Sequence, residues 1–148
     1  MSATNRAERA KEHYFSGLNC AQSTTMALAD EVGLDESVIK AVAAPFGGGV
    51  ARSRSLCGAV SGMLMAIGAA HPDYTKAEIY AISRKAMEEF STRFGSLNCS
   101  ELLSGLNVDN SPAPSERTAE YYASRPCGDI IAGAVEIAEK FIKKESKP

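Results

Sequence analysis

Hydrophobic residues recur along this chain at helical spacing, and no segment alternates apolar and polar residues as a β-strand would. The first predicted helix runs from Ser2 to Phe15, and Ser16 and Gly17 end it. A second predicted helix starts behind Asn19 and ends at Gly33, because glycine is a common residue just beyond a helix.

Two further helices are predicted on either side of a glycine-rich stretch. Asp35 is a suitable N-cap for a helix that Pro45 and the glycines after it end. The segment 57–70 is apolar on nearly all sides, which predicts a buried central helix.

The second half of the chain also reads as helical. A long amphipathic helix is predicted from its cap, Thr75, to about Phe94, with Glu78 placed to complete a capping box. The remaining predicted elements are a short helix from Asn98 to near Gly105, a turn through Tyr121 and a last helix that opens at Cys127. The pattern predicts an all-α bundle of about six to eight helices in a single domain over residues 1–148.

Composition and charge narrow the class of protein. Hydrophobic residues make up 45% and charged residues 23%, as in an ordinary soluble domain. The net charge of −2 argues against nucleic-acid binding. No apolar run is long enough for membrane insertion, and the polar N-terminus does not resemble a secretory signal, so we expect a cytoplasmic protein.

The four cysteines each fall at or within one turn of a predicted helix start. They are Cys20, Cys57, Cys99 and Cys127. The positive end of a helix dipole and its unpaired amides favour a thiolate over a thiol. No CxxC pair is present, which excludes a thioredoxin-type motif and local zinc knuckles.

Three interpretations of these cysteines remain open. If the fold brings the four thiols together, they suit a [2Fe–2S] or [4Fe–4S] cluster, or a zinc ion with tetrahedral coordination. Such a zinc ion would stabilise the fold of an interaction module. If they work in pairs, Cys57 is the expected attacking thiolate, with a lowered pKa, and Cys20 is a second candidate catalytic thiol. In the third interpretation they are buried free cysteines.

Glycines surround Cys57 at a density that needs an explanation, since glycine costs up to about 1 kcal/mol in a helix relative to alanine. The candidates for contact with a bound cofactor are Gly47, Gly48, Gly49, Gly58 and Gly62. The loop formed by residues 47–55, which includes Arg52 and Arg54, can also bind an anion through its backbone amides and the two arginines. The interpretation we favour is that these glycines let the backbone approach the partner of Cys57 closely.

Two segments repeat one pattern: FSGLNCAQ at 15–22 and FGSLNCSE at 94–101. Both place an asparagine as N-cap and a cysteine at the first helical position. Either two helix starts present thiols in one geometry, or both segments converged on good capping chemistry.

The order of motifs resembles the redox-active C-GCAxxG-C-C family. The resemblance rests on NCAQ at 19–22, FGGG at 46–49, CGAVSG at 57–62, CSELL at 99–103 and the isolated Cys127, and it spans roughly residues 13–140. It implies that Cys20, Cys57, Cys99 and Cys127 are the defining cysteines, with Gly58, Ala59 and Gly62 completing the CGAxxG motif. A similar domain in split-Soret cytochromes is associated with an iron–sulfur centre, but this chain has no CxxCH haem site.

These observations together favour a small redox protein whose four cysteines bind an iron–sulfur cluster for electron transfer or sensing. Members of the family that this chain resembles are often encoded beside transporters or oxidoreductases. We therefore expect the redox partner of this protein to be an oxidoreductase. The chain itself would be an oxidoreductase or an accessory redox protein, and a cluster shared across a homodimer is compatible with the spacings. No residue pattern supports hydrolase chemistry.

Overall fold

The computed structural model describes residues 3–104, 106 and 111–143. Within these ranges the chain forms nine α-helices and no strand, apart from an isolated bridge between Leu56 and Asn98. The helices are α1 (Ala3–Phe15), α2 (Cys20–Ala27), α3 (Ala29–Val32), α4 (Glu36–Ala43), α5 (Gly58–Ala70), α6 (Lys76–Phe94), α7 (Cys99–Leu102), α8 (Ala119–Ser124) and α9 (Cys127–Ile142), with a 3-10 turn, η1, at Ala44–Phe46. The predicted all-α fold is confirmed.

The helix count exceeds the expected six to eight because the second predicted helix is split and the turn predicted at Tyr121 is a short helix, α8. Leu28 leaves helical geometry at φ −103° and ψ 1°, which separates α2 from α3. The hydroxyls of Thr24 and Thr25 donate to the carbonyl oxygens of Cys20 and Ala21, one turn back. Such bonds bend a helix and weaken its continuation.

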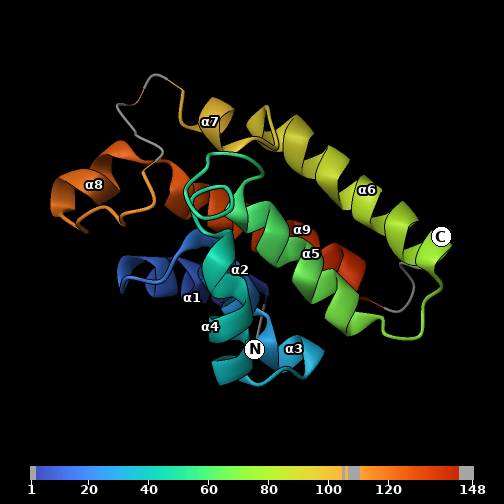
Figure 1. Cartoon of the computed structure of the whole chain (residues 1–148). Helices are drawn as coiled ribbons and strands as arrows, with labels where there is room; N and C mark the ends of the chain where they lie inside the picture. The colour runs from blue at the N-terminus through green and yellow to red at the C-terminus, as the bar shows by residue number, and fades with distance from the viewer. Residues whose placement is uncertain (1–2, 105, 107–110, 144–148) are drawn as a thin grey trace.

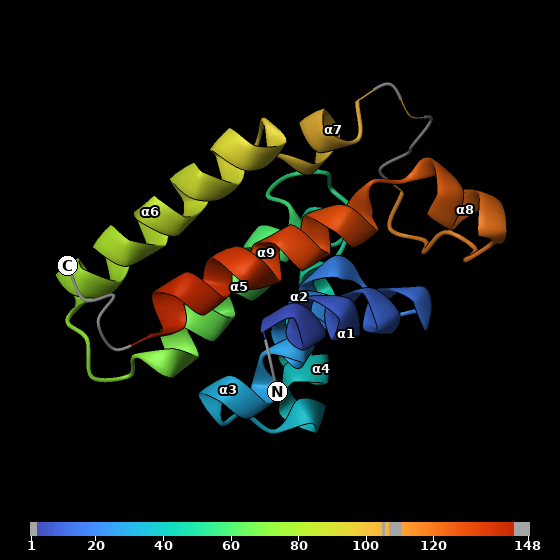
Figure 2. The ribbon, with the colours of Figure 1, turned by 180° about the vertical axis from the view of Figure 1, so that it is seen from behind.

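The core is a ring of four helices, in which α5 packs on α2 and α9, and α1 packs on the other sides of the same two helices. The long α6 lies along α9 and α5 (Figures 1 and 2). Val60, Met63 and Ile67 of α5 are fully buried. The expectation of a buried central helix at 57–70 is therefore confirmed.

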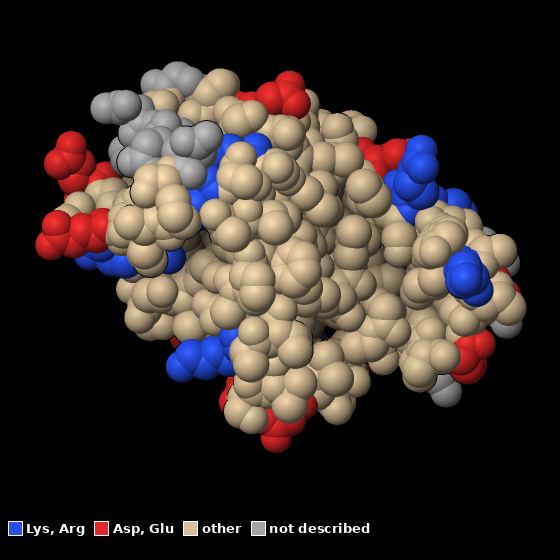
Figure 3. All heavy atoms as spheres, in the orientation of Figure 1, with Lys and Arg blue, Asp and Glu red and all other residues tan. Residues whose placement is uncertain are grey.

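The helix starts that carry cysteine converge toward one end of this bundle. The coil between η1 and α5 lies there beside α7 and the beginning of α9 (Figure 1). The face seen in this orientation is mostly uncharged, with acidic and basic residues around its margin (Figure 3). In the described part of the chain, no helix is both long and apolar enough to cross a bilayer.

Some expectations fall outside the described residues. These are the start of the first helix at Ser2 and the end of the sixth near Gly105. The Thr75–Glu78 capping box of α6 and the Asp35 cap of α4 are both present as predicted.

Candidate functional site: a cavity lined by four thiols

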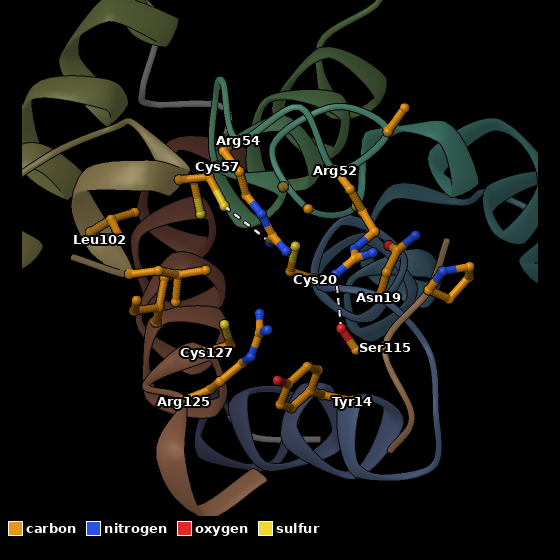
Figure 4. Close-up of a pocket in the computed structure, with 18 of the residues that line it drawn as sticks. Tyr14, Asn19, Cys20, Arg52, Arg54, Cys57, Leu102, Ser115, Arg125 and Cys127 are labelled. Atoms are coloured by element: carbon orange, nitrogen blue, oxygen red, sulfur yellow. Dashed lines mark hydrogen bonds between the residues drawn. The ribbon is translucent and has the colours of Figure 1, made fainter. Parts of the chain in front are cut away.

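All four cysteines line a single cavity of about 280 Å³ (Figure 4). It lies where α2, α5, α7 and α9 begin, and residues of the 112–125 segment form its outer wall. The fold therefore brings together side chains that the sequence holds far apart. All four are free thiols.

Each thiol is positioned by a helix start, as the sequence predicted. Cys20 and Cys99 are the first residues of α2 and α7, behind the N-caps Asn19 and Asn98. The repeated LNC segments thus share the N-cap and the cysteine position, but Asn19 accepts from the Gln22 amide in a capping box, whereas Asn98 accepts from the Ser100 amide. Cys57 is itself the N-cap of α5, and Cys127 is the first residue of α9.

The pKa of the Cys57 thiol is raised, which contradicts the lowered value expected from its position. Burial is the main cause, since the residue is only 7% exposed, and the neighbouring Cys20 raises the pKa further. The amides of Ala59 and Val60 at the start of α5 face the sulfur and act in the opposite direction. Desolvation of a charge outweighs the helix terminus here.

Two of the other thiols follow the same rule. Burial raises the pKa of Cys20, although a hydrogen bond from the Gly48 amide lowers it. Burial, and to a smaller extent the nearby Cys20, raise the pKa of Cys127 to about 11. Tyr14 and the positive charge of Arg125 lower this pKa, but by less. At neutral pH these cysteines are protonated unless something positive binds them.

The glycines admit close backbone contacts around the thiols. A Cβ on Gly58 would lie 2.3 Å from Cys20 Sγ, and one on Gly49 would lie 2.6 Å from Cys99 Cβ. At Gly58 the absence of a side chain lets the backbone at the start of α5 approach Cys20 closely. Gly47 and Gly48 also line the cavity.

Gly62 has a different position from the other candidate glycines. It does not line the cavity and instead packs on α2, where a Cβ would lie 2.7 Å from the Ala21 carbonyl oxygen. Its own carbonyl accepts a hydrogen bond from the Thr25 hydroxyl at 3.1 Å. This glycine serves close helix packing.

The loop between η1 and α5 contains a left-handed turn over residues 48–52, all with positive φ. Val50, at φ 71°, is a β-branched residue in a region that costs such residues about 1–2 kcal/mol. Backbone bonds hold the turn, including Ser55 N–H to Gly49 O at 2.8 Å, and Cys99 N–H donates to Ser55 O at 2.7 Å. The strained turn thereby fixes the start of α7, and strain of this kind is common at functional sites.

Four arginines line the cavity, and none of the described residues around it is Asp or Glu. Arg54 is 8% exposed and its Nη1 donates to Cys99 Sγ at 3.8 Å. Arg52 donates to Ser111 O and Ser115 Oγ, both at 2.8 Å. The described residues 112–115 therefore form part of the cavity wall.

The aromatic part of the site was not predicted from the sequence. The guanidinium of Arg117 lies over the rings of Tyr14 and Tyr121, at 5.0 and 4.9 Å, and that of Arg125 lies 4.4 Å from Tyr121. For Tyr121 the sequence predicted only a turn. The position of Arg125, two residues before Cys127, was the one local signal for this group.

The size of the cavity distinguishes between the two metal groups, a cluster and a zinc ion, proposed from the sequence. No three Cys, His, Asp or Glu side chains among the described residues surround a single metal-ion position. The cavity is instead about twice the roughly 150 Å³ volume known to admit a benzene molecule. Four sulfur donors around a space larger than an ion fit an iron–sulfur cluster better than zinc, which needs four ligands at about 2.0–2.3 Å.

The chain also matches a known protein family. Residues 18–141 match the family described as "Putative redox-active protein (C_GCAxxG_C_C)". The matched segment includes all four cysteines and the whole cavity except Tyr14. No curated protein and no solved structure matches the chain significantly.

Proposed function

The chain belongs to the redox-active C_GCAxxG_C_C family, and from that premise we propose that its four cysteines bind an iron–sulfur cluster for electron transfer or redox sensing. Cys20, Cys57, Cys99 and Cys127 would hold the cluster, which supplies one-electron redox chemistry when bound. One observation supports the proposal most strongly: four cysteines, each at the start of a different helix, line one cavity.

The charges around the cavity support a negatively charged occupant. Four cysteine ligands lose their protons on binding, and a cluster with its four thiolates carries net negative charge. The four arginines that line the cavity, among whose described neighbours in its wall there is no Asp or Glu, offset this charge. Arg54 donates directly to a ligand sulfur, and Gly48 donates its amide to another.

The raised thiol pKa values fit the same proposal. A buried thiolate without a cation is costly, so Cys57 and Cys20 are poor nucleophiles in the metal-free protein. Positive iron reverses this cost, because it stabilises the deprotonated sulfur.

A second candidate function is thiol–disulfide exchange between Cys20 and Cys57. The close approach of Gly58 to Cys20 Sγ brings the start of α5 beside Cys20, which favours this pair. Oxidation would join the two sulfurs and release two electrons and two protons, and an oxidised partner protein would accept the electrons. Such a protein would be colourless and iron-free.

The proposal is tested by reconstitution with iron and sulfide without air, on the wild type and four single Cys→Ala variants. We expect each variant to retain less than about half of the wild-type iron and sulfide, because each loses a ligand. Lys85→Ser, on the exposed side of α6, is the control and should load fully. Full loading of all four cysteine variants would contradict the proposal.

A further inference from the structure

We infer that the cavity also binds a small oxyanion, a carboxylate or an inorganic oxyanion, through the Arg125 guanidinium and the Tyr14 hydroxyl beside Cys127. This inference goes beyond the proposed cluster and does not depend on it, because neither group is a proposed cluster ligand. It would make the protein a redox protein with its own small-molecule ligand.

Arg125 presents unused hydrogen-bond donors to the cavity. Among the described residues it makes no hydrogen bond or ion pair, and its contact is the stacking on Tyr121 at 4.4 Å. Figure 4 shows its guanidinium beside Cys127 and directed toward the interior of the cavity. A guanidinium held by an aromatic ring keeps its planar fork free for bidentate binding of an oxyanion.

Tyr14 supplies a second donor at the same place. Its side chain is 2% exposed, and its hydroxyl makes no hydrogen bond of normal geometry among the described residues. The hydroxyl faces Cys127 and Tyr121, and it lies on the same side of the cavity as Arg125 (Figure 4). A buried hydroxyl without a partner is costly, so a bound acceptor explains it.

The other arginines have structural partners, in contrast to Arg125. Arg52 holds the loop through Ser111 and Ser115, and Arg117 donates to the carbonyl oxygens of Tyr14 and Leu18 at 3.2 Å each. These charges still act on the cavity, where no described carboxylate opposes them. The field therefore attracts an anion, and Arg125 with Tyr14 gives it a defined position.

The inference is tested by calorimetric titration of the protein with acetate, sulfate and phosphate at fixed ionic strength, using the protein as purified without air and after removal of any metal. We expect saturable binding of at least one of these anions in one or both forms. Acetate binding would identify a carboxylate ligand, and sulfate or phosphate binding an inorganic oxyanion.

Variants assign the binding to these residues. We expect Arg125→Gln to weaken binding at least tenfold, Arg125→Lys to retain part of it, and Tyr14→Phe to weaken it by about tenfold. Arg84→Gln on the exposed face of α6 is the matched control and should change affinity less than twofold.

The absence of saturable binding by all three anions, in both forms of the protein, would overturn the inference. Binding unchanged in both Arg125→Gln and Tyr14→Phe would overturn it as well, and circular dichroism establishes that the variants are folded. Neither result bears on the cluster, which the iron and sulfide content tests separately.

Discussion

At the scale of single residues, burial and helix position act on the thiols in opposite directions. The start of α5 offers amides to Cys57, yet desolvation raises its pKa, and the same holds for Cys127 at the start of α9. A cysteine at a helix terminus is therefore reactive only where water also reaches it.

Alkylation of the metal-free protein tests this balance. Because the pKa of Cys57 and Cys20 is raised, their thiolate fraction at pH 7 is smaller than in the unfolded chain, where the pKa is about 8.5. We expect iodoacetamide to modify the folded protein at least ten times more slowly than the denatured protein. Mass spectrometry locates the modified cysteines. If Cys57 were modified as fast in the folded protein as in the denatured protein, or faster, the result would favour Cys57 as an attacking thiolate.

Arg54 gives a second prediction at this scale. Its positive charge and its bond to Cys99 Sγ favour the reduced, more negative state of a bound cluster. Arg54→Gln should lower the midpoint potential by an amount on the order of tens of millivolts, and Arg84→Gln should leave it unchanged. A potential that is unchanged in a fully loaded Arg54→Gln protein would show that this arginine does not act on the centre.

At the scale of elements, α5 contains glycines with opposite roles. Gly62 faces α2 with no room for a Cβ, whereas a Cβ on Gly68 meets nothing within 4 Å. We expect Gly62→Ala to lower the free energy of unfolding by about 1–3 kcal/mol through overpacking. Gly68→Ala should raise it by about 0.5–1 kcal/mol. Urea denaturation measures both, and equal effects would refute the packing role of Gly62.

The N-cap of α4 predicts a pH dependence. The Ser37 hydroxyl and the Ser37 and Val38 amides lower the pKa of Asp35 below its ordinary value. Its stabilising contribution is therefore complete above the unfolded pKa, about 3.9, and is lost as the pH falls through the lower folded pKa. We expect the stability difference between wild type and Asp35→Asn to shrink below about pH 4, and a constant difference would contradict this.

Local chemistry made most of the elements predictable. The caps Asn19, Asp35 and Thr75 act within one turn of the chain, so their effect is visible in the sequence. The break at Leu28 was missed, because the helical pattern of apolar residues continues through it. The left-handed turn at 48–52 was also missed, because Val50, Ala51 and Arg52 disfavour positive φ and long-range bonds impose it.

At the scale of the whole molecule, the bundle gathers helix starts around one cavity. The four cysteines could be predicted as a set, since their type and their helix positions were shared. Tyr14 and Arg125 could not, because a tyrosine in the first helix meets an arginine more than one hundred positions later only through the packing of α1 on α9. The volume of the cavity likewise depends on the assembled fold.

The most direct test of the account is the visible absorption spectrum of protein purified without air, together with its iron and acid-labile sulfide content. We predict a coloured protein with sulfide in about equal proportion to iron, bound at a level that the four cysteines can hold. A colourless protein free of iron and sulfide, both as purified and after anaerobic reconstitution, would contradict the central claim and favour the thiol–disulfide alternative.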